Sequence, residues 1–314
     1  MSLHQVSGRW KRGLLLALVT AGCWATLPVV LKITLEQIDP YTLTWFRFLF
    51  AAGVMGAWLA ARRGLGGFAT LDGKRWWLLG VAAACLIGNY LFYLLGVQLT
   101  SPGNAQLLIQ LAPLLMALGG IVVFREAFNR WQWLGLAILA TGLLLFFRDQ
   151  LGVPRAAEDA PARAAYLLGS GLVILAAVVW AIFALVQKQL LVRLSSPAIM
   201  LFIYAVASGV LLPVARPGAL LQLDLLHAGL LLFCALNTLV AYGAFAEALA
   251  HWEASRVSTV LAVTPLLCVG VVALVHAIWP AAIRPEAIGA TGYVGAGLVV
   301  LGSAVASLMG ARRR

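Results

Sequence analysis

Residues 13–33 read GLLLALVTAGCWATLPVVLKI, and Lys32 is the single charged residue in this stretch. A stretch of about 20 apolar residues is long enough to cross the hydrocarbon core of a bilayer as a helix. It is also longer than the apolar core of a cleaved signal peptide, which has about 7–15 residues. We therefore predict that this stretch is the first transmembrane helix.

The whole chain has the same apolar character. Of its 314 residues, 63% are hydrophobic and 11% are charged, whereas soluble domains have roughly 45–50% apolar and about 25% charged residues. The surplus apolar side chains must face lipid. Because the apolar runs are continuous and do not alternate as in a β-barrel, and because lipid cannot satisfy open backbone groups, we predict an all-α membrane protein.

Ten stretches of this kind are predicted to be transmembrane helices. They are 13–34, 41–61, 76–98, 103–124, 131–147, 166–188, 197–215, 225–248, 257–279 and 286–309. With the N-terminus inside, 15 of the 22 basic residues fall in cytoplasmic segments and five in outer loops, with Lys32 and Arg47 near the outer ends of their helices. This bias predicts that both termini are cytoplasmic.

The basic residues lie in short clusters at the ends of apolar runs, where they attract anionic lipid and fix orientation. The net charge of +11 therefore predicts contact with the lipid bilayer and no nucleic-acid partner. We expect a multi-pass protein of a cell inner membrane, either a monomer or a homodimer.

The chain divides into two matching parts: residues 1–148, a charged linker at 149–165, and residues 166–314. The matched pairs, in order, are Trp24 with Trp180, Lys32 with Lys188, Pro40 with Pro197, Tyr90 with Tyr242, Pro113 with Pro265, Gly135 with Gly295 and Gly142 with Gly302. Because five is odd, a second set of five helices enters the membrane from the opposite side. We predict two inverted five-helix repeats, the architecture of many secondary transporters; duplication without a transport role is the alternative.

Polar and aromatic side chains inside the spans are the candidate substrate-binding residues, because such groups are costly in lipid and tend to face the protein interior. They are Trp24, Asn89, Tyr90, Tyr93, Gln106, Gln110, Trp180, Asn237, Tyr242 and Ser258. Aromatics, amides and hydroxyls with few charges suit a neutral or zwitterionic solute with an apolar side chain.

Two prolines are candidate hinges. Gln106, Gln110 and Pro113 fall at i, i+4 and i+7, so they share one face of the predicted fourth helix, and Ser258 and Pro265 lie on the matching face of the ninth. Each proline removes a backbone donor and favours a kink. The alternative is that the prolines are packing kinks and the glutamines make interhelical bonds.

Few charged side chains lie near the spans. Lys32 and Arg47 are the deep basic residues, and one interpretation is that they snorkel or pair with Glu36 and Asp39. Glu247 is the one acid clearly inside a predicted span. It is either a proton site or an interfacial residue.

No enzyme motif is present: the sequence has no Walker A motif, no HExxH and no GxSxG. Its four cysteines, Cys23, Cys85, Cys234 and Cys268, lie in apolar runs without CxxC spacing, and the histidines do not group as metal ligands. We predict that the protein is not an enzyme and has no metal site and no cofactor.

An ordered set of motifs resembles the drug/metabolite transporter superfamily, in its ten-helix branch with two EamA-type domains. The set consists of Trp24-Ala25, Asp39-Pro40 through Arg47, Ala112-Pro113, Phe124-Arg125-Glu126 with Gln132 and Gly135, then Trp180, Thr264-Pro265 and Gly295. The second half lacks a counterpart of Glu126. The pattern is similar to that of bacterial aromatic amino-acid exporters, which implies an inner-membrane exporter with a central substrate cavity between its halves.

The expected function is therefore secondary transport of small organic solutes by alternating access, with aromatic and other neutral amino acids as substrates. A multidrug or organic-cation exporter is the alternative within transport, with cation–π binding by Trp24 or Trp180. A membrane sensor or scaffold that does not transport is the alternative from another class.

Overall fold

The computed structural model describes residues 9–62, 68, 71–124, 129–152, 160–252, 257, 260–261, 263–284 and 288–310. Within these ranges the protein is helical and contains no strand. The predicted all-α class is therefore confirmed.

The described helices follow the predicted segments closely. They are α1 (Trp10–Thr34), α2 (Pro40–Ala61), α3 (Gly73–Leu99), α4 (Pro102–Leu108), α5 (Leu111–Phe124), α6 (Arg130–Gly152), α7 (Ala160–Leu190), α8 (Ser196–Leu211), the 3-10 helix η2 (Pro217–Gln222), α9 (Leu225–His251), α11 (Thr264–Ile278) and α12 (Ala290–Gly310).

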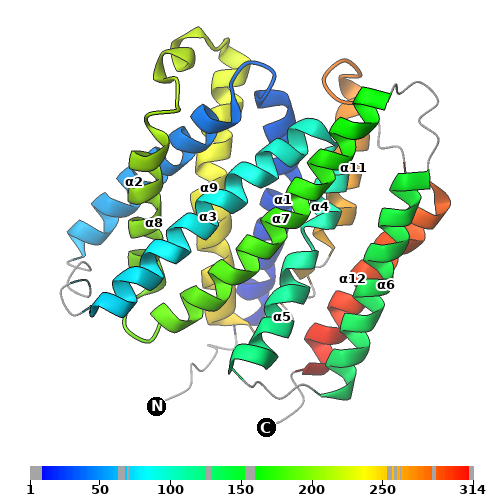
Figure 1. The fold of residues 1–314 in the computed structure, drawn as a ribbon, viewed down its shortest axis with the longest axis horizontal. Coiled ribbons are helices and arrows are strands. Elements are labelled where there is room, and N and C mark those ends of the chain that lie inside the picture. The colour runs from blue at the N-terminus through cyan, green and yellow to red at the C-terminus, as the bar shows by residue number, and fades with distance from the viewer. Residues whose placement is uncertain are drawn as a thin grey trace.

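Among the described residues, six helices are both long and apolar enough to cross a membrane, and they lie in α1, α2, α3, α6, α7 and α9. The apolar stretches of α8, α11 and α12 are shorter. Ten membrane crossings therefore stay a prediction. The start of α1 and the end of α12 lie at the same end of the bundle (Figure 1).

The helix predicted over 103–124, with a kink at Pro113, is divided into two helices, so the prediction that Gln106, Gln110 and Pro113 share one face was wrong. The chain turns at Ile109 and Gln110, between α4 and α5. Pro113 is the physical reason, because it has no N–H to donate to the carbonyl of Ile109. That carbonyl instead accepts from the N–H of Ala112 at 2.9 Å in a tighter turn. Gln106 and Gln110 consequently do not lie on one face of a single helix.

The helix predicted over 257–279 is also interrupted. Residues 260–261 are helical, but α11 begins only at Thr264, with Pro265 in its first turn. The N–H of Val263 donates to the carbonyl of Val260 at 3.3 Å, which is again a tight turn before a proline. Ser258, on the predicted polar face, lies outside the described residues.

The main helix contacts join the two parts of the sequence. Helix α6 packs on α12, α3 on α7, α1 on α9, α2 on α8 and α5 on α7. Figure 1 shows α2 beside α8 at one edge of the bundle and α6 beside α12 at the other. The contacts between α1 and α3, which belong to the same sequence half, are much less extensive.

Two of these pairs repeat the same close contact. Gly13 of α1 lies against Trp252 at the end of α9, and Gly169 of α7 lies against Leu99 and Thr100 at the end of α3. Since Gly13 and Gly169 hold corresponding places in the two halves, the α1–α9 pair and the α7–α3 pair have matching geometry where they meet.

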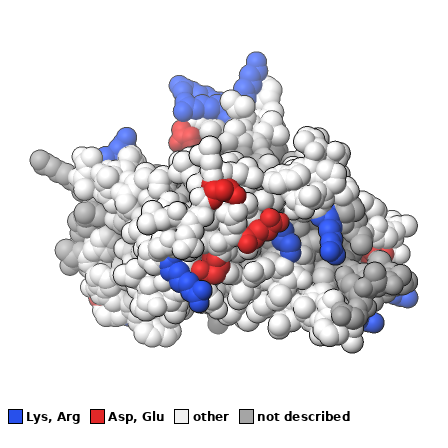
Figure 2. Space-filling model, turned by 90° about the horizontal axis from the view of Figure 1, so that it is seen from above, with Lys and Arg blue, Asp and Glu red and all other residues white. Residues whose placement is uncertain are grey.

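Most of the surface is uncharged. Large apolar side chains such as Leu15, Trp77 and Leu144 point outward from their helices. Such outward-facing apolar side chains are typical of a protein surrounded by lipid. Figure 2 looks onto the end of the bundle opposite the two termini and shows a few acidic and basic side chains, with basic ones grouped at one edge.

Glycines let α6 and α12 approach closely. A Cβ atom added at Gly142 would lie 2.6 Å from the carbonyl oxygen of Gly295, and one added at Gly302 would lie 2.6 Å from that of Gly135. Small residues at a helix interface permit this backbone contact in membranes. The glycines that the sequence matched across the halves are therefore the residues at which these two helices meet.

Several helices begin at a side-chain cap, among them α2, α3 and α9. Asp39 accepts from the N–H groups of Tyr41 and Thr42 at the start of α2, and Asp72 accepts from Arg75 at the start of α3. Asp224 accepts from the N–H of His227 at 2.8 Å at the start of α9. Each cap satisfies an N–H that the first turn of a helix leaves open.

The cap at Asp224 also joins α9 to the turn after α1. The Gln37 side-chain amide donates to an Asp224 carboxylate oxygen at 2.7 Å. The backbone N–H of His227, then its ring, and the Gln37 amide lower the pKa of Asp224 from 3.8 to about 2.

We predict that Gly142→Ala destabilises the protein by about 1–3 kcal/mol, because the added methyl forces α6 and α12 apart. Gly297→Ala on α12 is the matched control, since a Cβ there meets nothing within 4 Å. Thermal unfolding of the purified protein in detergent measures both. Equal melting temperatures for the two variants would contradict the close contact.

We predict that the stabilising effect of Asp224 depends on pH. Its folded pKa lies below its unfolded value, so its contribution is fully present above about pH 4 and is lost as the pH falls toward 2. The melting temperatures of the wild type and Asp224→Ala should therefore differ at pH 5 and converge near pH 2. Asp224→Asn, which keeps an acceptor but does not titrate, should show no such convergence with Asp224→Ala.

Candidate functional site

A buried arginine lies where helices from both parts of the chain meet. Arg47 of α2 is 3% exposed. Its Nε donates to the hydroxyl oxygen of Thr238 on α9 at 3.1 Å. Its guanidinium carbon lies 4.9 Å from the centre of the Tyr90 ring on α3, a cation–π contact.

The interpretation that Arg47 and Lys32 pair with Asp39 and Glu36 was wrong. The carboxylate of Asp39 is used to cap α2, where it also accepts from the Thr42 hydroxyl at 2.6 Å. The ammonium of Lys32 donates to the carbonyls of Val97, Gln98 and Thr100 at 2.9, 2.5 and 2.8 Å. Lys32 therefore binds the carboxyl end of α3, where the helix dipole favours a cation.

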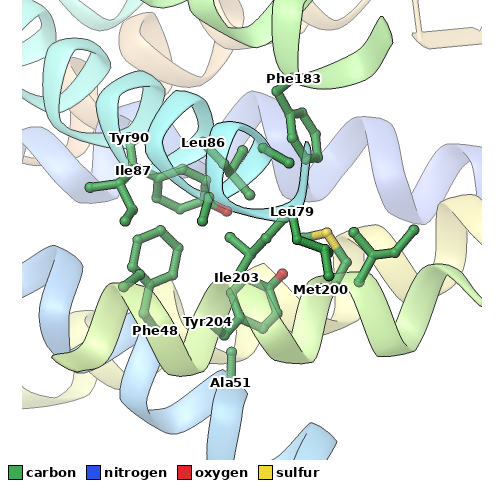
Figure 3. Close-up of a cluster of buried hydrophobic side chains, with 14 of the residues drawn as sticks. Phe48, Ala51, Leu79, Leu86, Ile87, Tyr90, Phe183, Met200, Ile203 and Tyr204 are labelled. Atoms are coloured by element: carbon green, nitrogen blue, oxygen red, sulfur yellow. The ribbon is translucent and has the colours of Figure 1, made fainter. Parts of the chain in front are cut away.

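Tyrosines surround Arg47. The Phe48 ring lies 4.6 Å from that of Tyr90 and 5.6 Å from that of Tyr204, and Figure 3 shows these three rings converging from α2, α3 and α8. The Tyr90 hydroxyl lies near the hydroxyl groups of Tyr242 and Thr238. The cluster thus combines one cation with several hydroxyl groups. We call Arg47, Tyr90, Tyr204, Thr238 and Tyr242 the arginine–tyrosine cluster.

Both parts of the chain supply this cluster. Arg47 lies seven residues after Pro40, and Tyr204 lies seven residues after Pro197. Sequence reasoning missed Tyr204 and Thr238 and left Arg47 open. The sequence could have indicated Arg47 and Tyr204 as a matched pair, because each lies seven residues after one of the two matched prolines.

The matched tryptophans lie beside the cluster. The Trp24 ring of α1 is 5.9 Å from the Tyr242 ring and 5.8 Å from that of Phe245. The Trp180 side chain of α7 lies near the Tyr242 hydroxyl. Both tryptophans are half-buried. The structure therefore brings the candidates Trp24, Tyr90, Trp180 and Tyr242 together.

Tyr93 and Gln106 form a second polar pair. The Tyr93 hydroxyl donates to the Gln106 side-chain oxygen at 3.0 Å, which links α3 to α4. Gln106 is 8% exposed, whereas Gln110 lies half-buried in the turn that follows. Electrostatic contact between Tyr93 and Arg47 places this pair at the border of the arginine–tyrosine cluster.

The two candidate asparagines, Asn89 and Asn237, bond to the backbone of neighbouring helices. Asn89 donates to the carbonyl of Ala176 at 2.9 Å, which ties α3 to α7. Asn237 donates to the carbonyl of Cys23 at 2.9 Å, which ties α9 to α1. Both side-chain amides therefore fasten helix pairs together. The Asn237 oxygen is buried and accepts no hydrogen bond among the described residues.

The candidate hinges lie on the two helix interruptions. Pro113 is exposed, and Pro265 is buried in the first turn of α11. Each proline follows a turn that separates two helical segments. Their role as hinges remains a prediction.

Glu247 lies in an ionic cluster at one end of the bundle. It is 3.4 Å from Arg12 of α1 and 3.0 Å from His251 of α9. Its side chain is 49% exposed, as an interfacial residue would be. In the part of the chain that the structure describes, no group of three or more His, Cys, Asp or Glu side chains forms a metal site.

Comparison with known proteins gives the same picture of the whole chain. The profile of the EamA-like transporter family matches residues 11–148 and residues 167–308. The uncharacterized inner membrane transporter YhbE of Escherichia coli strain K12 is 37% identical over 292 residues, which are 93% of this chain and 89% of that protein. An uncharacterized transporter of Haemophilus influenzae strain Rd is 30% identical over 296 residues, which are 94% of each chain.

A solved crystal structure shares the fold. It has 19% sequence identity and a TM-score of 0.63, and the match covers 97% of this chain and 98% of the other.

Proposed function

This chain belongs to the EamA-like transporter family and is a multi-pass inner-membrane protein. We propose that it is a secondary transporter that exports small organic solutes by alternating access. Its substrates are aromatic and other neutral amino acids. Export is the direction that the family resemblance implies.

The architecture in this proposal is ten membrane crossings in two inverted five-helix repeats, with both termini in the cytoplasm. The repeated contact of Gly13 with α9 and of Gly169 with α3 supports it, as do the five pairings between the halves. In an inverted repeat the inward-open and outward-open states exchange the roles of the halves.

The moving units are the α1–α9 and α3–α7 pairs. Asn237 fastens the first pair and Asn89 fastens the second, whereas α1 and α3 share few contacts. Lys32 bridges the two pairs at one end of the bundle through its bonds to the carboxyl end of α3. When the contacts between the two helix pairs break at one end of the bundle and form at the other, the substrate site opens to one side of the membrane and closes to the other. The interruptions at Pro113 and Pro265 supply the bending.

The observation that carries the substrate assignment is that Trp24 and Trp180 both lie beside Tyr242 of the arginine–tyrosine cluster. Half-buried rings from both halves suit an apolar or aromatic side chain. Pro28 lies inside α1 and has no N–H to donate to the carbonyl of Trp24, which makes this carbonyl the candidate acceptor for the ammonium group of the solute. The buried positive charge of Arg47 disfavours organic cations, which argues against the multidrug alternative.

The test is flux through vesicles that contain the purified protein and a panel of amino acids, with and without a proton gradient. We expect saturable flux of phenylalanine and tryptophan that is lost or reduced at least about fivefold in Trp24→Ala and Trp180→Ala, because each loses ring contact worth about 1 kcal/mol or more. Trp77→Ala is the control, since Trp77 is 67% exposed at the start of α3. Equal rates in all three variants would place the rings outside the transport path.

We further predict that Pro113→Ala slows transport several-fold while expression and substrate affinity stay near those of the wild type. Alanine restores an N–H for the carbonyl of Ile109, so α4 and α5 join more nearly into one helix. Initial rates and equilibrium binding, measured on the same preparation, separate the two effects. A wild-type rate in Pro113→Ala would remove the hinge.

A further inference from the structure

Arg47 is the one lysine or arginine whose side chain is buried in the part of the chain that the structure describes. A buried charge is normally paired with an opposite charge, because leaving it unpaired in a medium of low dielectric is costly. Among the described residues, the salt bridges involve Arg12, Arg75, His227 and His251 and do not include Arg47.

The sequence itself places acidic side chains away from Arg47. No Asp or Glu occurs between Asp39 and Asp72, or between Asp72 and Glu126, or between Asp224 and Glu247. Helices α2, α3 and the first five turns of α9, which surround the guanidinium, therefore have no carboxylate to offer within their spans. Asp39, the nearest acid in sequence, is engaged in the cap of α2.

The hydrogen-bonding capacity of Arg47 is mostly unused by the described residues. A guanidinium has five N–H donors. The one hydrogen bond that the described residues accept from it goes from Nε to Thr238. Thr238 in turn donates to the carbonyl of Cys234 at 3.0 Å. The contact with Tyr90 is to the face of a ring and uses no N–H.

Lys32 provides the comparison within the same protein. It is the other deep cation, and its ammonium donates to three carbonyl oxygens. An ammonium has three N–H donors, so these bonds match its full capacity. The chain thus satisfies one deep cation with its own backbone and leaves the terminal nitrogens of the other without an acceptor from the described residues.

We propose that Arg47 is the subsite that binds the carboxylate of the transported solute, an inference that rests on the proposed transport function. The guanidinium fork matches a carboxylate in two parallel bonds. Hydroxyls of the arginine–tyrosine cluster supply further donors, and Trp24 and Trp180 contact the apolar part of the solute. The favoured ligands are carboxylates with an apolar or aromatic side chain, whether zwitterionic or anionic.

The experiment measures equilibrium binding to the full-length purified protein, so that it does not depend on flux. The probes are matched pairs that differ at the carboxylate alone: 3-phenylpropanoate with 3-phenylpropanol, and phenylalanine with phenylalaninamide. We expect the wild type to bind each carboxylate at least about tenfold more tightly, as a charge-assisted hydrogen bond predicts. Arg47→Gln should lose this preference while its affinity for 3-phenylpropanol stays within about twofold.

Two further variants test whether a loss of the carboxylate preference is specific to the guanidinium group of Arg47. Arg47→Lys keeps the charge but not the fork, so it should retain part of the preference and shows whether folding tolerates change at this position. Arg62→Gln is the control, because Arg62 lies at the exposed end of α2 with its guanidinium carbon 4.8 Å from the Trp58 ring centre. It should keep the full preference.

Equal affinity of the wild type for both members of each pair, or a preference that survives in Arg47→Gln, would overturn the proposal. So would the absence of saturable binding by every carboxylate in the panel. Flux without a carboxylate preference would leave the transport function standing and remove the subsite. A carboxylate preference that depends on Arg47, without flux in vesicles, would support the subsite and contradict the transport function.

Discussion

A backbone N–H or C=O group inside the hydrocarbon core of a bilayer has no water to bond. Each spanning segment of this chain must therefore satisfy its backbone within its own helix, and the chain has little freedom except in how the helices pack. Hydrophobic burial gives no preference for one helix partner over another in lipid. Packing instead depends on close contacts such as Gly142 against Gly295 and on side-chain amides such as Asn89 that bond a neighbouring backbone.

The points at which the backbone departs from this constraint are informative. Proline cannot complete the helical ladder, and Pro113 and Pro265 each follow an interruption in their half of the chain. The open groups at such places are either bonded in a tighter turn, as the carbonyl of Ile109 is, or are open to a ligand. Transporters place irregular backbone where it lines a path for solute, and both interruptions fit that pattern.

Charged side chains are also costly inside the bilayer, so their positions are informative. Three described carboxylates, those of Asp39, Asp72 and Asp224, lie at helix ends, where they cap α2, α3 and α9. Arg47 departs from this rule, since it is buried between helices of both halves with neutral neighbours. Keeping an arginine there is costly to folding, so its value must lie in recognition. A transporter that meets its solute at this layer gains selectivity for an anionic group and rejects cations by the same charge.

By itself, the sequence determined the helices and their approximate ends, because hydrophobic length and proline positions are local properties. Its repeated spacings also predicted which residues correspond between the halves, including Trp24 with Trp180 and Tyr90 with Tyr242. Only the tertiary structure decided which side chains meet. Thr238 lies 191 residues from Arg47, and whether they face each other depends on the rotation of α2 and α9 about their axes. In helices that are apolar all round, no periodic pattern reveals that rotation, so packing between the halves fixed it.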